Sequence, residues 1–412
     1  MTNWKETTLG EVVDIIIDHR GMTPKKMGGD WASVGYRAVS AKSIKTGQLV
    51  NEDQMNLLPE NLYRKWMKEE VEYGDILLTS EAPLGEHIIW KSEEKLVLSQ
   101  RIFGIRTEKE VFDPFFFNYF IDSKYYQHQL KSRESGSTVT GIKQSELLKT
   151  KILLPPLSEQ KEIAGVLSSL DDKIELLREE NKTLEATAQA IFKEWFVNFN
   201  FPGATGKMID SELGKIPEWW GVGKIKDLIN IFSGFAFSSS DFIQNGKYRL
   251  VTIKNVQDRY FVQDIKDTFD DLPLKMPQYC HLKTGDILLS LTGNVGRICL
   301  VVGENYLLNQ RVAKLEAING KDYAFTYLLF LQESIFSLLQ NTASGTAQQN
   351  LSPVQTKEIE IVMPARFVLD TFGDIGNPMI KKVNQNNFQI QTLSTFRDTL
   401  LPKLMSGDLR IK

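Results

Sequence analysis

Apolar residues recur at alternating spacings of four and three between residues 158 and 199, a stretch without proline. This pattern predicts a helix with a heptad seam that faces a partner helix. Asn181 is the one polar residue in the seam. The predicted seam residues are Ile163, Leu167, Leu170, Ile174, Leu177, Asn181, Leu184, Ala188, Ile191 and Trp195.

The same register recurs near the C-terminus with weaker members. Asn386 is a polar seam residue there, and Ile390 stands at the position that corresponds to Asn181. Pro402 is expected to kink or end this second helix, so that Leu404 would not join the seam. The corresponding residues are Phe372, Gly376, Met379, Val383, Asn386, Ile390, Leu393, Arg397, Leu400 and Leu404.

A stretch of mixed strand and helix patterns precedes each predicted long helix, and the two stretches repeat one another. The matching phrases include YRAVSAK (36–42) with YRLVTIK (248–254), GDILLTSEAPLG (74–85) with GDILLSLTGNVG (285–296), and SGSTVTGIK (135–143) with SGTAQQN (344–350). Matches in the same order indicate a tandem duplication. The GDILL runs predict strands, and Asp75 and Asp286 are interpreted as turn caps before them.

Two long helices with matching seams are expected to pack on each other. A helix of about 40 residues is about 60 Å long. The linker of roughly 18 residues, 200–217, would have to be almost fully extended to join a parallel pair, but it joins an antiparallel pair easily. Asn181 would then face Asn386, and their amides would fix the register at some cost in stability. The alternative is that both asparagines are tolerated surface positions.

The predicted fold is α+β, with two globular repeats joined by two long helices in an antiparallel coiled coil, related by a pseudo-two-fold axis. We place the first repeat at residues 1–156 and the second repeat at residues 218–365. The first spacer helix is expected at 157–199, the linker at 200–217, and the second helix with the C-terminal tail at 366–412.

Composition narrows the possible functions. A hydrophobic fraction of 42% and a charged fraction of 25% are ordinary for a soluble protein. No signal peptide is visible, and the longest apolar patch, FDPFFFNYF, is too short to span a membrane. The two cysteines do not form a disulfide framework, which favours the cytoplasm. A net charge of −3 argues against a chain that coats DNA by charge alone, and it leaves room for local basic faces.

Several phrases resemble the specificity (S) subunits of Type I restriction-modification systems, the HsdS family. They are LPPLSEQKEIAGVLSSLDDKI (154–174), AIFKEWFVNF (190–199), SELGKIPEWW (211–220) and LLPKLMSGDL (400–409). Their order also matches, and the resemblance covers essentially the whole chain. It implies that the two repeats are target recognition domains that read a bipartite, asymmetric site on double-stranded DNA, with the coiled coil as spacer.

The resemblance also implies partners. These are two modification (methyltransferase) subunits and restriction (motor-nuclease) subunits, which would carry the adenine methyltransferase and ATP-dependent endonuclease activities. The sequence holds no G-x-x-x-x-G-K-[ST] motif and no Asn-Pro-Pro-aromatic signature, and its four histidines are scattered. We therefore expect a non-catalytic chain without cofactor or metal. The alternative is a two-headed protein-interaction scaffold that does not bind DNA.

Base edges are read by Arg, Lys, Asn, Gln, Ser and Thr, so the candidates are polar loops that differ between repeats on a shared scaffold. Four loop classes qualify, and for any single residue a solvated loop position is the alternative. In the first repeat the candidates are Arg20, Lys25, Lys26, Arg37, Lys42, Lys45, Ser80, Arg101, Ser137, Thr138 and Lys143. In the second repeat they are Ser238, Ser239, Arg249, Lys254, Asn255, Thr292, Asn294, Arg297, Arg311, Thr346, Gln348 and Gln349.

Two further expectations stay open at this point. The Gln-Arg pairs at 100–101 and 310–311 fit a structural hydrogen bond to a loop as well as they fit a DNA contact. A nearly neutral chain should bind DNA weakly alone. We therefore expect that the modification subunits complete a clamp around the DNA together with this chain. Their docking surface is expected on the coiled coil and the adjacent faces, including Trp195, Phe196 and Phe199. These aromatic residues fit a core between helix and linker equally well.

Overall fold

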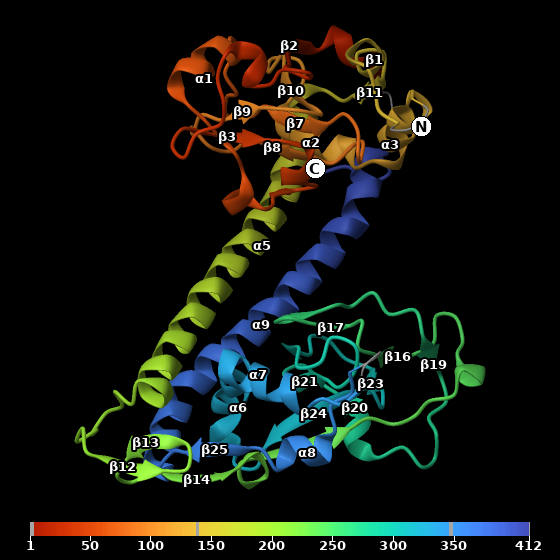
Figure 1. Cartoon of the computed structure of the whole chain (residues 1–412). Coiled ribbons are helices and arrows are strands. Elements are labelled where there is room, and N and C mark those ends of the chain that lie inside the picture. The colour runs from red at the N-terminus through yellow and green to blue at the C-terminus, as the bar shows by residue number, and fades with distance from the viewer. Residues whose placement is uncertain (1–3, 137–139, 346–348, 412) are drawn as a thin grey trace. The chain divides into compact units, whose positions relative to one another are not determined.

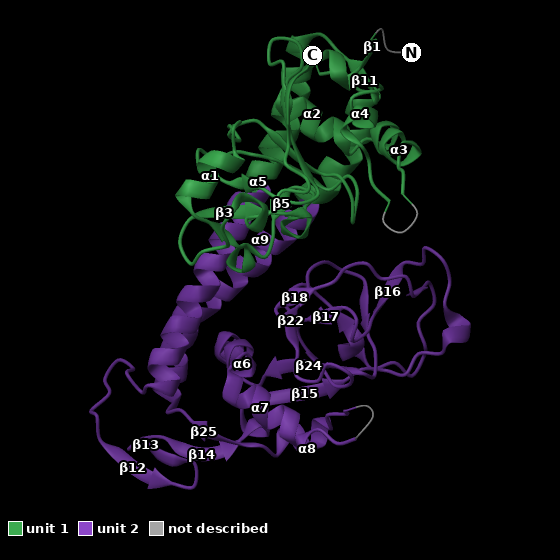
Figure 2. Cartoon of the chain, turned by 45° about the horizontal axis from the view of Figure 1, so that its top comes forward, with its two compact units in different colours: residues 1–173, 393–412 green, residues 174–392 purple. Residues whose placement is uncertain are grey.

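The computed structural model describes residues 4–136, 140–345 and 349–411 (Figure 1). The chain divides into two compact units (Figure 2). Unit 1 comprises residues 1–173 and 393–412, and unit 2 comprises residues 174–392. Each unit therefore contains one of the repeats and a part of each long helix.

The two long helices are α5 (Leu157–Phe192), which continues as a π-helical turn at Lys193–Val197, and α9 (Arg366–Met405). In unit 2 the ring of Phe192 packs on Phe372 with centroids 5.9 Å apart. In unit 1 Asp171 binds Arg397 at 2.7 Å. Phe192 follows Asp171 along α5, whereas its partner Phe372 precedes Arg397 along α9. The two helices therefore run antiparallel, as the linker length predicts.

The expectation that Pro402 ends the second helix and keeps Leu404 out of the packing was wrong. Helix α9 continues through this residue to Met405, and Leu404 is 1% exposed in the core of unit 1. A proline removes one backbone donor, which costs most in a helix interior. Pro402 lies in the last turns, where little of the hydrogen-bond ladder follows it, and burial of Leu404 and Met405 stabilises those turns.

Each repeat is built on a four-stranded antiparallel sheet, and the two sheets have the same strand order. The first is β2 (Val13–Asp18), β10 (Ile102–Thr107), β7 (Ile76–Thr79) and β8 (His87–Ile89). The second is β15 (Ile229–Ser233), β24 (Val312–Ala317), β21 (Ile287–Ser290) and β22 (Ile298–Leu300). The repeated GDILL phrases form β7 and β21, whose residues are all buried. The common topology confirms the tandem duplication.

A smaller sheet accompanies each of these. In the first repeat its order is β6 (Leu57–Leu58), β3 (Tyr36–Val39) and β9 (Val97–Leu98). In the second it is β19 (Thr268–Phe269), β16 (Tyr248–Val251), β23 (Tyr306–Leu308) and β20 (His281–Leu282). The repeated YR phrases lead β3 and β16, and each of these strands pairs in parallel with the strand after it in the sheet, β9 or β23.

A terminal strand pair closes each repeat beside the start of its long helix. These pairs are β1 (Lys5–Thr8) with β11 (Lys151–Leu154), and β14 (Gly221–Lys224) with β25 (Glu360–Met363). The shorter helices are α1 (Glu60–Trp66), α2 (Pro114–Ile121), α3 (Lys124–Ser132), α4 (Gln144–Leu147), α6 (Tyr323–Phe330), α7 (Glu333–Thr342) and α8 (Pro353–Lys357). The remaining strands are β4 (Ile44–Lys45), β5 (Gln48–Leu49), β17 (Val256–Gln257) and β18 (Tyr260–Phe261). The linker folds into a hairpin that the sequence pattern did not predict, β12 (Met208–Ser211) and β13 (Gly214–Pro217).

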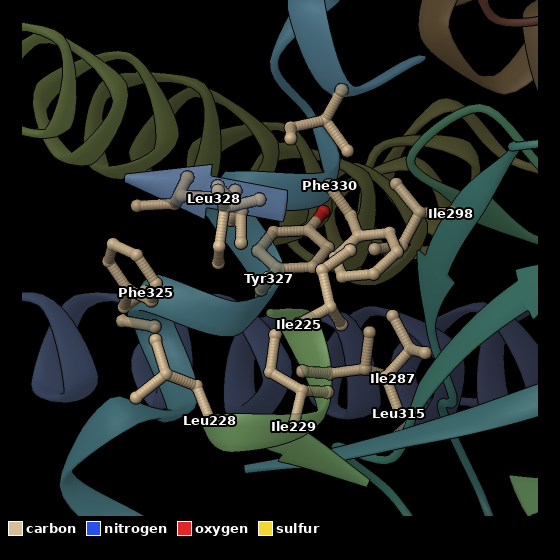
Figure 3. Close-up of a cluster of buried hydrophobic side chains, with 14 of the residues drawn as sticks. Ile225, Leu228, Ile229, Ile287, Ile298, Leu315, Phe325, Tyr327, Leu328 and Phe330 are labelled. Atoms are coloured by element: carbon tan, nitrogen blue, oxygen red, sulfur yellow. The ribbon is translucent and has the colours of Figure 1, made fainter. Parts of the chain in front are cut away.

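Aromatic helices fill the space beside each main sheet. Helix α2 starts because Asp113 caps the backbone N–H of Phe116 and Pro114 occupies the first turn. In the second repeat, Phe325, Tyr327, Leu328 and Phe330 of α6 gather with Ile287 and Leu315 of the sheet (Figure 3). In the described part of the chain, no helix combines the length and the apolar character that crossing a membrane requires.

Candidate DNA-reading surface

Loops that are distant in the sequence of the first repeat meet through backbone hydrogen bonds. The N–H of Ile142 donates to the carbonyl of Ser80 at 2.9 Å, and the N–H of Ser80 donates to the carbonyl of Arg101 at 2.8 Å. The Arg20 guanidinium donates to the carbonyl of Ile142 at 3.1 Å. The described residues of 18–26, 79–85, 100–101 and 135–143 therefore form one assembly, which we call the first loop cluster.

The second repeat builds the same arrangement. The N–H of Leu351 donates to the carbonyl of Leu291 at 2.7 Å, and the N–H of Leu291 donates to the carbonyl of Arg311 at 3.0 Å. The N–H of Phe235 donates to the carbonyl of Leu308 at 2.9 Å. The described residues of 233–241, 291–297, 308–311 and 344–351 form the second loop cluster.

Equivalent bridges join the loops in both clusters. Glu81 forms an isolated β-bridge with Gly141, and Thr292 forms one with Asn350. A Cβ atom on Gly141 would lie 2.8 Å from the carbonyl oxygen of Ser80, so only glycine permits this approach without a shift. The bridges place Glu81 and Thr292 at equivalent positions of the two clusters.

Carboxylates hold two arginines of the first loop cluster. Arg20 donates from Nε and Nη2 to both oxygens of Asp18, at 2.9 and 2.8 Å, and its guanidinium lies 4.2 Å from the ring centroid of Phe103. Arg101 forms an ion pair with Glu81, with 2.9 Å between Nε and Oε1. Both arginines therefore have an oriented, partly exposed guanidinium instead of a freely moving one.

The second loop cluster has different chemistry at the same places. Arg311 is exposed, and its N–H donates to Oδ1 of Asn309, two residues earlier, at 3.1 Å. Among the described residues, the side chain of Arg311 has no carboxylate partner. Arg297 donates to Oε1 of Gln257, and the side-chain oxygen of Asn294, in the amide orientation that satisfies both groups, accepts from Arg297 at 3.1 Å.

The loops that carry Lys42 and Lys45 in the first repeat, and Lys254 and Arg259 in the second, lie beside the edge strands β8 and β22 of the main sheets. The N–H of Gly47 donates to the carbonyl of His87 at 3.0 Å, and Lys45 lies 3.7 Å from Glu86. In the second repeat the N–H of Arg259 donates to the carbonyl of Ile298 at 2.8 Å. Lys42, Lys45 and Lys254 are exposed there.

Two predicted candidates lie on the smaller sheets instead of in the loop clusters. Arg37 on β3 pairs with Glu52 and Glu94. Arg249 on β16 lies 4.5 Å from the ring centroid of Tyr306 and donates to the carbonyl of Glu304 at 3.1 Å. Further candidates that are exposed in loops are Lys25, Lys26, Lys143, Ser238, Ser239 and Gln349. The predictions for Ser137, Thr138, Thr346 and Gln348 concern positions outside the described residues.

Burial corrects the assignment of two candidates. Ser80 is 1% exposed and Asn255 is 4% exposed. Oδ1 of Asn255 accepts from the N–H of Thr252 at 2.9 Å, and Nδ2 donates to the carbonyl of Val262 at 2.9 Å. These contacts give Asn255 a structural role in its turn, and the Ser80 side chain is covered by its own loop cluster.

A buried ion pair supports the base of each main sheet. Asp75 binds Arg106 at 2.8 and 3.0 Å, and Asp286 binds Lys314 at 3.1 Å. The hydrogen bond with Asp75 raises the pKa of Arg106. Asp75 and Asp286 also accept from backbone N–H groups at 2.9 Å, which confirms the turn-cap interpretation. The sequence analysis did not single out Arg106 or Lys314, although each is a charged residue that interrupts an apolar strand pattern.

The seam of the long helices contains an amide contact. Nδ2 of Asn386 donates to Oδ1 of Asn181 at 2.9 Å, and Nδ2 of Asn181 donates to Oδ1 of Asn387 at 2.8 Å. Lys382 and Glu180 flank the contact at 3.6 Å. Asn181 and Asn386 thus face each other, while their role in fixing the register stays a prediction.

Of the three aromatic residues expected at a docking surface, Trp195 lies in the core of unit 2, and Phe196 and Phe199 are partly buried against this core. The ring centroid of Phe196 is 4.9 Å from Phe325 and 5.0 Å from Phe372. Trp195 is 9% exposed and packs on Phe372, and Phe199 packs on Trp220 at 5.3 Å. This packing favours the alternative of a core between helix and linker and argues against direct docking on these rings.

An open cavity of about 950 Å³ lies within unit 2, between the second repeat and α9. Residues 283–287 and the end of β24 line one side. Lys381, Asn384 and Phe388 of α9 line the other, and Phe388 is 45% exposed. Across the described ranges, no three His, Cys, Asp or Glu side chains gather in a way that could hold a metal ion.

Comparison with known proteins gives these two loop clusters a context. The chain matches the model of the Type I restriction modification DNA specificity domain twice, over residues 1–186 and 217–366. It is 28% identical to the Type I restriction enzyme MjaIX specificity subunit of Methanocaldococcus jannaschii, over 95% of this chain and 87% of that protein. It is 22% identical to the HindI specificity subunit of Haemophilus influenzae, over 99% of this chain and 100% of that protein.

A solved structure has the same fold. The S subunit of a Type I restriction-modification system from M. genitalium superposes with a TM-score of 0.61 at 18% identity, over 98% of this chain and 96% of that one. The two domain matches together cover most of the sequence, and they coincide with the two repeats that carry the loop clusters. The chain therefore belongs to the family of Type I restriction-modification DNA specificity domains.

Proposed function

We propose that this chain is the specificity subunit of a Type I restriction-modification complex and reads a bipartite, asymmetric site on double-stranded DNA. Each loop cluster would read one half-site, and the two antiparallel helices would set the spacing between them. The observation that carries the proposal is the pair of loop clusters, which share one scaffold and differ in the side chains they present.

The chemical differences suit two unlike half-sites. Glu81 of the first loop cluster corresponds to Thr292 of the second, so a charged acceptor replaces a hydroxyl. Arg20 follows β2 in the first repeat, and the equivalent position after β15 in the second repeat is Phe235. Because base edges in the major groove are distinguished by their donors and acceptors, such changes alter which base pairs fit.

The chain is proposed to act without catalysis of its own, alongside partner subunits that modify and cut DNA. Two modification subunits are proposed, one for each repeat, because the main sheets of the two repeats share one strand order. Restriction subunits would join this assembly. The net charge of −3 supports a shared clamp, because counterion release from phosphates then depends on cations of the partners.

We propose the cavity of unit 2 as one docking surface for a modification subunit. Its wall on α9 includes the exposed apolar ring of Phe388, together with Lys381 and Gln385. An exposed aromatic residue beside a cavity with polar walls is typical of a protein–protein anchor. We propose Phe388 as the docking residue in place of Trp195, Phe196 and Phe199, because the rings of those three residues pack on other aromatic side chains.

The test is a selection from random duplex DNA with the purified chain, alone and with its modification subunit. We expect a split motif of two short, unlike half-sites with a fixed gap, enriched when the partner is present. Replacing residues 1–156 with the corresponding repeat of another specificity subunit should change one half-site alone. No enrichment under either condition would contradict the proposal and favour a protein-interaction scaffold.

A further inference from the structure

The ion pair between Arg101 and Glu81 leaves one edge of the guanidinium available. Glu81 lies on the Nε side, with 2.9 Å between Nε and Oε1. Within the described residues, Nη1 and Nη2 of Arg101 have no hydrogen-bond partner. The side chains of Arg101 and Glu81 are 43% and 33% exposed, so the pair is accessible from solvent.

The backbone fixes both members of the pair. Arg101 has a φ of 69°, an uncommon left-handed conformation for a residue with a long side chain. Its carbonyl accepts from the N–H of Ser80, the residue before Glu81. On the other side, the β-bridge with Gly141 brings that residue so close that a Cβ there would lie 2.8 Å from the Cβ of Glu81. The pair is therefore held in place before any ligand binds.

We infer that Glu81 is a positioning residue that directs the Nη edge of Arg101 toward a guanine in the half-site read by the first repeat. The inference rests on the proposed function and goes further, because it assigns a base to one loop cluster. Arginine recognises guanine through two parallel donors to O6 and N7. With Glu81 on the Nε side, Nη1 and Nη2 are the donors that remain for this bidentate contact.

The carboxylate also distinguishes a base from a phosphate as the target. A phosphate beside Arg101 would lie close to the negative charge of Glu81 and would be repelled by it. The edge of a G·C pair carries no net charge, and N4 of its cytosine donates a hydrogen bond that a carboxylate can accept. The arginine–carboxylate pair thus complements a G·C base pair better than it complements the DNA backbone.

The second loop cluster provides an internal contrast. Arg311 lies at the position equivalent to Arg101, because the carbonyl of each accepts from a backbone N–H at the end of the repeated strand, that of Ser80 or of Leu291. Thr292 takes the place of Glu81 there, so Arg311 has no carboxylate that would orient it or repel a phosphate. The guanine assignment therefore applies to one half-site only.

The experiment compares base preferences of three variants, each assembled with the modification subunit and selected on random duplex DNA. Glu81→Gln keeps the size of the side chain and removes its charge. Arg101→Lys keeps the charge and removes the planar fork. Glu146→Gln is the matched control, since Glu146 forms an exposed ion pair with Lys149 outside the first loop cluster.

We expect Arg101→Lys to reduce the preference for guanine at one position by about tenfold or more, and Glu81→Gln to reduce it at the same position by a smaller factor. Both should leave the other half-site unchanged, and Glu146→Gln should leave both unchanged. A purely structural role would instead weaken binding evenly at all positions. The measured melting temperature of each variant separates loss of folding from loss of reading.

Several results would overturn the inference. One is an unchanged guanine preference in both variants, and another is a change at a base pair without guanine. A change in both half-sites would also contradict it. If the complex of the chain without substitutions enriches no split motif, the proposed function fails together with the base assignment. If that motif appears and the variants leave it intact, only the role of Glu81 and Arg101 is wrong.

Discussion

Asn386 donates a hydrogen bond to Asn181 at 2.9 Å, in the seam between the two long helices. Asn181 is 8% exposed and Asn386 is 1% exposed, so water competes little for these amides. Replacing Asn181 with Leu should remove one of two acceptors of the buried Asn386 amide, whose Nδ2 also donates to Oε2 of Glu180 at 3.1 Å. It should also leave Oδ1 of Asn387 without the amide that donates to it. We expect the free energy of unfolding to fall by about 1–3 kcal/mol, measured by urea denaturation.

The double variant Asn181→Leu with Asn386→Leu tests the same contact by an expected gain of stability over the single variant. It removes both polar groups, so its stability should recover to near that of the unmodified chain. A double variant as unstable as the sum of the single variants would show that the two amides act independently. Asn198→Ala is a suitable control, because that residue is exposed at the end of the π-helical turn.

The buried ion pairs at the base of the main sheets predict large effects of single substitutions. Asp75→Asn leaves Arg106 without its principal partner, and the side chain of Arg106 is only 10% exposed. We expect a loss of about 3–5 kcal/mol in the free energy of unfolding. Lys91→Met removes the exposed ion pair with Asp172 and should cost about 1 kcal/mol or less. Equal losses in the two variants would contradict this account.

Two aromatic residues of unit 2 are expected to have different effects, Phe196 on the stability of the fold and Phe388 on binding of the modification subunit. Phe196→Ala removes a ring that contacts Phe325 and Phe372, and should lower the free energy of unfolding by about 3 kcal/mol. Phe388→Ser should leave stability nearly unchanged but weaken binding of the modification subunit at least tenfold, because its ring is exposed beside the cavity. Calorimetry of the chain and titration with the partner distinguish the two effects. Unaltered binding in Phe388→Ser would exclude this docking surface.

Glu185 predicts a specific dependence of stability on pH. Burial raises the pKa of this carboxyl, and the positive charge of Arg259 opposes the shift. A raised pKa in the folded state means that stability is greatest below the unfolded pKa of about 4.3 and falls as pH rises through the folded pKa. Glu185→Gln has no charge to bury, so its advantage over the unmodified chain should grow between pH 4.5 and pH 8.

Denaturation with urea across this pH range measures the difference. Glu179→Gln on the same helix is the control, because the side chain of Glu179 is 62% exposed. A difference between Glu185→Gln and the unmodified chain that stays constant with pH would contradict the effect of burial.

The long helices and the repeated strands could be predicted from the sequence, because the seam spacing and the apolar runs persist over many residues. Shorter features could not. The hairpin of Met208–Ser211 and Gly214–Pro217 exposes Met208 and Ile209, so its strands lack the alternation that marks a half-buried strand. The effect of Pro402 was misjudged because the packing of Leu404 depends on residues distant in the sequence.

The candidate site could be predicted in part. Its loops follow repeated strands, so their positions in each repeat were visible from the sequence. Which loops meet was not visible, because hydrogen bonds such as that between Leu351 and Leu291 join residues far apart in the chain. The ion pair of Asp75 with Arg106 was missed for the same reason, since Arg106 lies on β10 and Asp75 directly precedes the neighbouring strand β7.

The buried ion pairs and aromatic helices have a consequence for how the chain can evolve. Their side chains are buried within each repeat, whereas the polar side chains that differ between the repeats lie in loops that follow the strands. Substitutions in exposed loops usually change the free energy of unfolding little. A lineage can therefore acquire a new recognition specificity one loop residue at a time, without passing through unfolded intermediates.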